Sequence, residues 1–355
     1  MKIRALKSWT VHIPYAPPVG PYVGRGGGGG TLGGAALVVR VDTDDGLTGW
    51  GEGTARLEPA AADLLTGRRA DDVEGALAAL KESGAGPGPA SGVEMALWDL
   101  LGKRAGLPVC SLLGGRLREE AEFTACMGLK EPSESAATAR EYVDRWGFTS
   151  LKTKAGNDPG QDLAIAEAVV REIDGEAELR PDANGGYGPE RAFEVMQQMK
   201  AVGVNRFEDP CDGEHAEVLV RCREEAGMEI LVNQGVTGPE SAVPLLASGA
   251  GDYLMPDTPA AGGVQPVQKV ARVAEGFGVP CLMHCSHDLG LKTVAITHLA
   301  ASTPNFSGPS DTCYHGLVDD VLAEPLVFRQ GRIAVPDGPG LGVEVDEEKL
   351  ERYSI

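Results

Sequence analysis

The sequence has little positive charge, few aromatic residues and no long apolar run. Its 355 residues carry 32 Lys and Arg against 52 Asp and Glu, a net charge of −20, and only 5% are aromatic. A field of that sign repels phosphate backbones and anionic lipid. Nowhere do about 18 apolar residues follow one another, the length that a membrane-spanning helix needs. We therefore expect neither a nucleic-acid partner nor a membrane association.

The cysteines do not follow the pattern of a disulfide framework. There are seven, an odd number, and none forms a C-x-x-C pair, which indicates free thiols in a reducing compartment. Residues 1–14 lack the apolar stretch of a signal peptide. We expect a soluble, cytoplasmic protein.

From about Glu122 onward, short apolar runs alternate with polar turns and helical patterns. The runs expected as buried strands are residues 150–153, 178–180, 205–207, 229–232, 253–255 and 280–283. In the helical pattern between the first two, Ile165, Val169 and Ile173 share one face. Such alternation predicts a parallel sheet of α/β class, and seven or eight units favour a closed barrel.

The two ends of the chain have a different pattern, typical of mixed α+β structure. Residues 36–41 are rich in β-formers, and Asp44-Asp45-Gly46 is typical of a hairpin turn. Ser91 and Glu94 have the spacing of a capping box, which predicts a helix start at Ser91. After about Asp319 the β pattern returns, and we expect this tail to rejoin the first domain.

One polar residue stands at the end of each expected barrel strand. These residues are spaced 28, 26, 25, 24, 27 and 27 positions apart: Lys154, Asp182, Glu208, Asn233, Asp257, His284 and Asp311. Because all strand carboxyl ends of a parallel barrel open on the same face, the seven side chains should converge in one mouth.

The residue types at these positions suggest a metal site and a base. Asp182, Glu208 and Asn233 come from three adjacent strands and offer only oxygen, which suits Mg²⁺. Asp257 and His284, on the next two, could form a dyad in which the carboxylate orients the imidazole as a general base.

Two pairs of residues with a spacing of two extend this site. Lys152 and Lys154 point to one side of their strand, as do Asp182 and Asn184. Lys154, beside Lys152 and a dication, is expected to have a lowered pKa and to serve as a base.

The motifs at these positions resemble those of the enolase superfamily, mandelate racemase subgroup. The matching motifs are Leu151-Lys-Thr-Lys154, Pro181-Asp-Ala-Asn-Gly185, Glu208-Asp-Pro210, Pro256-Asp257 followed by Gly262-Gly263, and His284. The nearest likeness is to the glucarate dehydratases, on Asn233, Glu208-Asp-Pro-Cys211, Thr297-His298, Asp311-Thr312 and the run from Ile333 to Val343. The resemblance covers nearly the whole chain. It implies a modified TIM barrel, (β/α)7β, at 119–318, and a capping domain of α+β type built from 1–118 and the tail 319–355.

The resemblance also implies a reaction. Lys154 would be one base, His284 with Asp257 the acid/base on the opposite face, and Asp311 would lie near the substrate carboxylate. A Mg²⁺-dependent dehydratase of this kind removes the proton α to the carboxylate of an acid sugar and eliminates the β-hydroxyl, giving a 2-keto-3-deoxy acid. A racemase or epimerase using the same two bases is the alternative, and a non-catalytic binding protein a more distant one.

Substrate contacts are expected from a loop of the first domain. Residues 20–25 resemble a substrate loop of the glucarate dehydratases, although Val19 stands where that family places a His. Tyr22 and Arg25 precede a glycine run at 26–30 that would form a lid or a flexible loop. Val19, Tyr22 and Arg25, with Asn184 and Ser286, are the expected substrate-binding residues. We expect a small carboxylate as the substrate and a homo-oligomer as the assembly.

Overall fold

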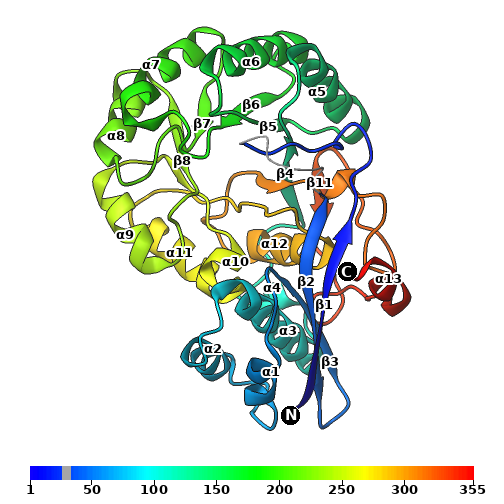
Figure 1. Cartoon of the computed structure of the whole chain (residues 1–355). Coiled ribbons are helices and arrows are strands. Elements are labelled where there is room, and N and C mark those ends of the chain that lie inside the picture. Colours follow the sequence, from blue (N-terminus) through cyan, green and yellow to red (C-terminus); the bar gives the residue numbers. More distant parts are fainter. Residues whose placement is uncertain (26–32) are drawn as a thin grey trace.

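The computed structural model describes residues 1–25 and 33–355. The glycine run at 26–30, expected to act as a lid, lies outside the described residues. A barrel of strands ringed by helices fills one part of the molecule, and a smaller sheet with helices, the cap, lies beside it (Figure 1). Within the described ranges, no helix combines the length and the apolar character needed to cross a bilayer.

The cap contains an antiparallel sheet and a short series of helices. The sheet has the order β1-β2-β3, and its elements are β1 (Ile3–Ile13), β2 (Gly34–Thr43), β3 (Thr48–Gly53), α1 (Pro59–Leu65), α2 (Val73–Glu82) and α3 (Pro87–Ala105). The expected hairpin turn joins β2 to β3, where Gly46 takes a φ of +88°.

Successive residues of β3 point alternately to its two faces, and this alternation determines how the cap packs. Gly49, Gly51 and Gly53 face α3 so closely that a Cβ at Gly51 would overlap the carbonyl oxygen of Gly92. Residues between them point to the opposite face of the strand. Glu52 is thereby directed away from α3 and toward the barrel.

The start of α3 differs from the expectation. The helix begins at Pro87, whose fixed φ suits the first turn, and Ser91 lies inside it, donating its hydroxyl to Gly88 O. Glu94 accepts hydrogen bonds from the backbone of another helix. The capping box predicted at Ser91 is therefore wrong.

The barrel alternates strands and helices as expected. Its elements are β4 (Glu120–Met127), α5 (Pro132–Trp146), β5 (Ser150–Lys154), α6 (Pro159–Ile173), β6 (Glu178–Asp182), α7 (Gly188–Ala201), β7 (Arg206–Glu208), α8 (Ala216–Glu224), β8 (Glu229–Val232), α9 (Pro239–Ser248), β9 (Tyr253–Leu254), α10 (Thr258–Ala261), α11 (Val264–Gly276), α12 (Gly290–Ser302) and β10 (Ser310–Thr312). The strands are parallel, in the order β10-β4-β5-β6-β7-β8-β9. A short helix, α4 (Val109–Leu112), precedes β4.

Residues 280–284 close the barrel between β9 and β10. They form single bridges in place of the regular strand expected at 280–283: Cys281 pairs with Leu254 and Phe306, and Asp311 N donates to Met283 O. Successive backbone groups of this segment bond to different partners, so no continuous ladder forms. With this segment counted, the (β/α)7β barrel of α/β class is confirmed.

The tail contacts both parts of the molecule. β11 (Arg332–Ala334) pairs antiparallel with the start of β4, in the barrel. Further on, α13 (Glu347–Tyr353) lies near β1, and Ile355 N donates to Thr10 O.

Candidate active site

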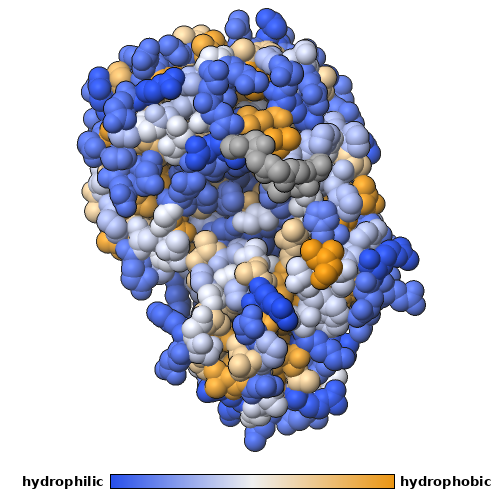
Figure 2. All heavy atoms as spheres, in the orientation of Figure 1, coloured by the Kyte–Doolittle hydropathy of each residue, from blue (hydrophilic) through white to orange (hydrophobic). Residues whose placement is uncertain are grey.

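The mouth of the barrel collects the polar residues that end its strands. Lys154, Asp182 and Glu208 are the last residues of β5, β6 and β7, Asn233 directly follows β8, and Asp311 lies in β10. Figure 2 shows a hydrophilic hollow on the face where barrel and cap meet.

Two of the three oxygen ligands expected for Mg²⁺, Asp182 and Glu208, lie together. Carboxylate oxygens of Asp182, Glu208 and Asp209 are within 4.8 Å of one another. Asp209 is already engaged, because its two oxygens accept the N–H groups of Asn233 and Gln234, each at 3.0 Å. It thus fixes the turn that carries Asn233, whose Nδ2 donates to Met255 O at 2.8 Å.

One buried carboxylate oxygen of Glu208 has an ion-pair partner but accepts no hydrogen bond from the described residues. Its Oε2 is buried and accepts no hydrogen bond from any described residue, although Arg180 Nε lies 3.2 Å away. Two carboxylates and one amide, with an oxygen that accepts no hydrogen bond from the described residues, fit a hard cation such as Mg²⁺.

A buried set of charges lies beside these oxygens. Lys152 Nζ is 2.8 Å from Glu208 Oε1, 2.8 Å from Asp311 Oδ2 and 3.1 Å from Asp182 Oδ2. The Arg180 guanidinium pairs with Asp311 and Glu208. Sequence reasoning missed Arg180, although its position two residues before Asp182 places both on one face of β6. Asp311 is therefore paired with two cations inside the barrel.

Lys154 contacts the expected ligand set directly. Its Nζ lies 2.6 Å from Asp182 Oδ2 and 3.2 Å from Asn184 Oδ1. Burial lowers the pKa of Lys154, but the carboxylates of Asp182 and Glu208 together outweigh burial and the Lys152 charge and raise it. The lowered pKa that we expect for Lys154 depends on a dication at this ligand set and stays a prediction. Asn184 also donates to Asp182.

Asp257 orients His284 and is itself held by a lysine. His284 Nδ1 lies 3.2 Å from Asp257 Oδ2, and the Ser286 hydroxyl donates to the same oxygen at 2.5 Å. Lys292 Nζ lies 2.6 Å from Asp257 Oδ1 and 2.7 Å from Asp288 Oδ1. Burial raises the pKa of Asp257, but Lys292 and His284 outweigh it, so the carboxyl stays ionised. Sequence reasoning missed Lys292, which lies in a helix buried on all sides.

The segment before the undescribed residues crosses the mouth. Val23 O accepts Leu129 N at 2.8 Å, just beyond β4, and Arg25 reaches the turn after β6, where its Nη1 lies 2.7 Å from the position a Cβ on Gly186 would take. Arg25 is exposed, whereas Val19 is fully buried and packs against Gly316. The structure thus places Arg25 above the mouth and Val19 in the core.

His287 is a further polar group at the mouth that the expected site did not include. It takes a φ of +63°, its Nδ1 lies 3.1 Å from the Tyr15 hydroxyl, and the Tyr22 ring meets it edge-on at 4.7 Å between centroids. Burial, with the charges of Lys154 and His284, lowers the pKa of His287 to about 3. The imidazole is therefore neutral at physiological pH and can accept or donate one hydrogen bond at each nitrogen.

Comparison with known proteins agrees with this geometry. Residues 134–349 match the family described as enolase C-terminal domain-like, and residues 29–114 match the mandelate racemase / muconate lactonizing enzyme N-terminal domain.

Individual relatives cover most of the chain. It is 31% identical to the probable glucarate dehydratase of Streptomyces coelicolor, over 97% of this chain and 86% of that protein. It is 32% identical to the D-galactarolactone cycloisomerase of Agrobacterium fabrum, over 90% of this chain and 92% of that protein. Muconate lactonizing enzyme from Pseudomonas putida superposes with a TM-score of 0.89 at 25% identity, covering 100% of both chains. Fold, strand-end residues and family matches together show that this chain is an enzyme of the enolase superfamily, in the branch of mandelate racemase and muconate lactonizing enzyme.

Proposed function

We propose that the protein is a Mg²⁺-dependent hydro-lyase that dehydrates an acid sugar or a related hydroxy acid to a 2-keto-3-deoxy acid. The observation that carries this proposal is the position of two proton-transfer groups beside one oxygen ligand set. Lys154 contacts that set through Asp182, and His284 is oriented by Asp257. The likeness to a probable glucarate dehydratase supports the same reaction.

The proton α to a carboxylate is very weakly acidic, so its removal requires stabilisation of negative charge on the carboxylate oxygens. Asp182, Glu208 and Asn233 would hold Mg²⁺, which supplies that stabilisation as a Lewis acid. Two carboxylates and a neutral amide leave more positive charge at the site than three carboxylates would.

In this proposal Lys154 takes the α-proton at Nζ. Asp182 both contacts Lys154 and belongs to the ligand set, so sharing its charge with a cation weakens its hold on the ammonium and lowers the pKa of Lys154. His284 then donates a proton to the β-hydroxyl. The C–O bond breaks, water leaves, and the resulting enol tautomerises to the 2-keto acid. Asp257 stabilises the imidazolium form that makes this donation.

Epimerisation is the second candidate, favoured by the separation of the two bases. Around the barrel, β5 and residues 280–284 are three positions apart by way of β10 and β4, so Lys154 and His284 approach a substrate from different sides. Where no β-hydroxyl is in reach, return of the proton from the second side gives the epimer. The likeness to a D-galactarolactone cycloisomerase, an isomerase by name, supports this second candidate.

A panel of mono- and diacid sugars incubated in D₂O with Mg²⁺ tests both candidates. A dehydratase forms a 2-keto acid, whereas an epimerase incorporates deuterium at Cα and keeps the hydroxyl. Lys154→Ala and His284→Asn should each abolish exchange at one α-configuration, with a loss of roughly 10²–10⁴-fold. Lys200→Ala, near the end of α7 and bonded to Asn205 before β7, lies at the opposite end of the barrel and is the matched control.

The proposal fails if both site variants exchange and turn over a true substrate as the wild type does. The proposal also fails if no member of the panel reacts and Mg²⁺ does not bind. A non-catalytic binding role is then the better hypothesis.

A further inference from the structure

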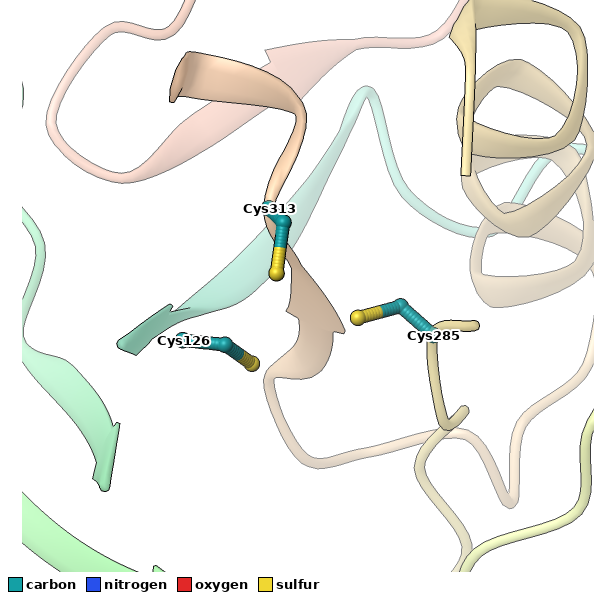
Figure 3. A group of neighbouring side chains, drawn as sticks. All are labelled: Cys126, Cys285 and Cys313. Atoms are coloured by element: carbon teal, nitrogen blue, oxygen red, sulfur yellow. The ribbon is translucent and has the colours of Figure 1, made fainter. Parts of the chain in front are cut away.

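Three buried cysteines form a compact group at the mouth of the barrel. The sulfur atoms of Cys126, Cys285 and Cys313 lie within 4.8 Å of one another, and all three are buried free thiols. Figure 3 shows the three sulfurs pointing toward one another from separate parts of the chain, with Cys126 on β4, Cys313 just after β10 and Cys285 on a segment without regular secondary structure. None of them takes part in the proposed reaction.

The register of the barrel explains why these residues meet. Cys126 on β4 is paired with Lys152 on β5, whose side chain points into the barrel. Asp311 on β10 also points inward, so Cys313, two residues later, returns to the same side. Cys285 comes directly after residues 280–284, the segment that lies between β9 and β10. The group therefore joins three neighbouring positions in the ring of strands, at the place where the barrel closes without a regular strand.

The chemistry of the group favours a cation over a reactive thiol. Burial raises the pKa of the Cys126 thiol, which donates to Thr124 O at 3.8 Å. Thiols kept protonated in this way are poor nucleophiles and oxidise slowly. The negative charge of Asp311 acts on Cys126, and that of Asp288 acts on Cys285 and Cys313. Both carboxylates are themselves ion-paired, Asp311 with Lys152 and Arg180 and Asp288 with Lys292, so it is the three converging sulfurs, and not the local charge, that favour a cation.

We propose that Cys126, Cys285 and Cys313 form a binding site for one thiophilic divalent cation of the Zn²⁺ and Cd²⁺ class, separate from the Mg²⁺ ligand set. Thiolate sulfur selects soft cations, whereas the carboxylate and amide oxygens of Asp182, Glu208 and Asn233 select hard ones. Binding converts three thiols to thiolates: three metal–sulfur bonds form, three S–H bonds break and three protons are released.

The spacing of the sulfurs fits such a site with small movements. Zn–S bonds of about 2.3 Å in a tetrahedral arrangement place the sulfurs about 3.8 Å apart. Sulfurs already within 4.8 Å of one another reach that spacing by shifts of roughly an ångström, which side-chain rotation supplies.

A cation here would tie β4, β10 and residues 280–284 together. Because those segments close the barrel, the bound cation should raise the stability of the folded protein by mass action. Residues 280–284 also carry His284, so the cation should lower the mobility of this proton-transfer group.

The test is titration of the full-length protein with Cd²⁺ in excess Mg²⁺, followed by the ultraviolet charge-transfer band of Cd²⁺–thiolate bonds. We expect the band to saturate at one Cd²⁺ per chain, three protons to be released per Cd²⁺, and the melting temperature to rise with Cd²⁺ concentration. Mg²⁺ should not compete, because it binds oxygen.

Cysteine variants decide where the band arises. Each single change should raise at least tenfold the Cd²⁺ concentration needed for the same band and the same rise in melting temperature. The three variants are Cys126→Ser, Cys285→Ser and Cys313→Ser. Cys222→Ser, a buried cysteine of α8, should change neither. A band that survives the three changes, or no band in a folded wild type, overturns the proposal. The proposal is also overturned if the isolated protein shows no band and has a mass lower by two hydrogens than the sequence gives. That mass would mean that two of these thiols form a disulfide.

Discussion

Glu94 gives the most direct test of how the cap is held on the barrel. It lies on α3 and is fully buried. Its oxygens accept Val264 N at 2.7 Å, Gln265 N at 2.9 Å and Trp98 Nε1 at 2.8 Å. Val264 and Gln265 begin α11 of the barrel, so a cap carboxylate binds the free N–H groups at the N-terminus of a barrel helix. Burial raises the pKa of Glu94 from 4.5 to about 7, and these donors only partly oppose it.

This shift links the stability of the protein to pH. A carboxyl group whose pKa is raised in the folded state stabilises that state fully below its unfolded pKa, and this contribution is lost as pH rises through about 7. The shift of 4.5 to about 7 is worth about 3 kcal/mol at most, at about 1.4 kcal/mol per pKa unit. Between pH 5.5 and 8.5 the part that is lost is about 2 kcal/mol.

Urea unfolding of the wild type and of Glu94→Gln at pH values from 5.5 to 8.5 measures this contribution. Gln cannot titrate, so the wild type should lose about 2 kcal/mol relative to the variant across the range. Glu52, whose pKa burial raises to about 8, titrates in both proteins and cancels in the difference. Glu190→Gln, an exposed change on α7, is the matched control. A difference between wild type and Glu94→Gln that does not change with pH would refute the reasoning.

Three further outcomes follow from the site. Arg25→Ala should raise KM for a diacid far more than for a monoacid, because Arg25 lies above the mouth near Gly186; equal effects on both would exclude Arg25 as a carboxylate clamp. Asn233→Asp should bind Mg²⁺ more tightly in calorimetry but lower kcat, because the added charge weakens the Lewis acid; an unchanged affinity would argue against Asn233 as a ligand. Lys292→Met should cost about 3–5 kcal/mol in urea unfolding, because it leaves buried Asp257 without its cation; a loss below about 1 kcal/mol would show that Asp257 does not depend on Lys292.

The positions of the polar strand-end residues could be predicted because they follow from a period. Lys154, Asp182 and Glu208 are each the last residue of a strand, and the regular spacing of such residues carries that information along the chain. Parallel strands in a closed barrel then bring them to one end. No knowledge of side-chain packing is needed for this step.

The failed capping box shows where local reasoning stops. Ser91 and Glu94 have the spacing of a helix start, but Glu94 binds backbone groups about 170 residues later in the chain. Tertiary packing places the Glu94 carboxylate beside the free N–H groups at the start of α11. These are better donors than those in the first turn of its own helix. Local sequence cannot distinguish the two cases, because the competing donors come from another domain.

The buried cations were missed for a related reason. Arg180 and Lys292 lie among apolar residues, and each is stabilised by carboxylates from other elements: Asp311 and Glu208 for Arg180, Asp257 for Lys292. Their roles depend on the order of strands around the ring. Closure of the barrel brings Arg180 of β6 next to Asp311 of β10, and packing of α12 on the barrel brings Lys292 next to Asp257.

In the proposed reaction, the contacts between cap and barrel would couple substrate recognition to proton transfer. Glu52 of β3 accepts Leu289 N at 2.7 Å and Lys292 N at 2.8 Å, at the start of α12. The loop between residues 284 and 289 carries His284 and His287, so a cap carboxylate fixes one end of the loop that positions both. The cap also carries Tyr15, Tyr22 and the segment that crosses the mouth. In the proposed reaction, a change in the cap that moves Glu52 should therefore alter proton transfer at His284 as well as substrate binding.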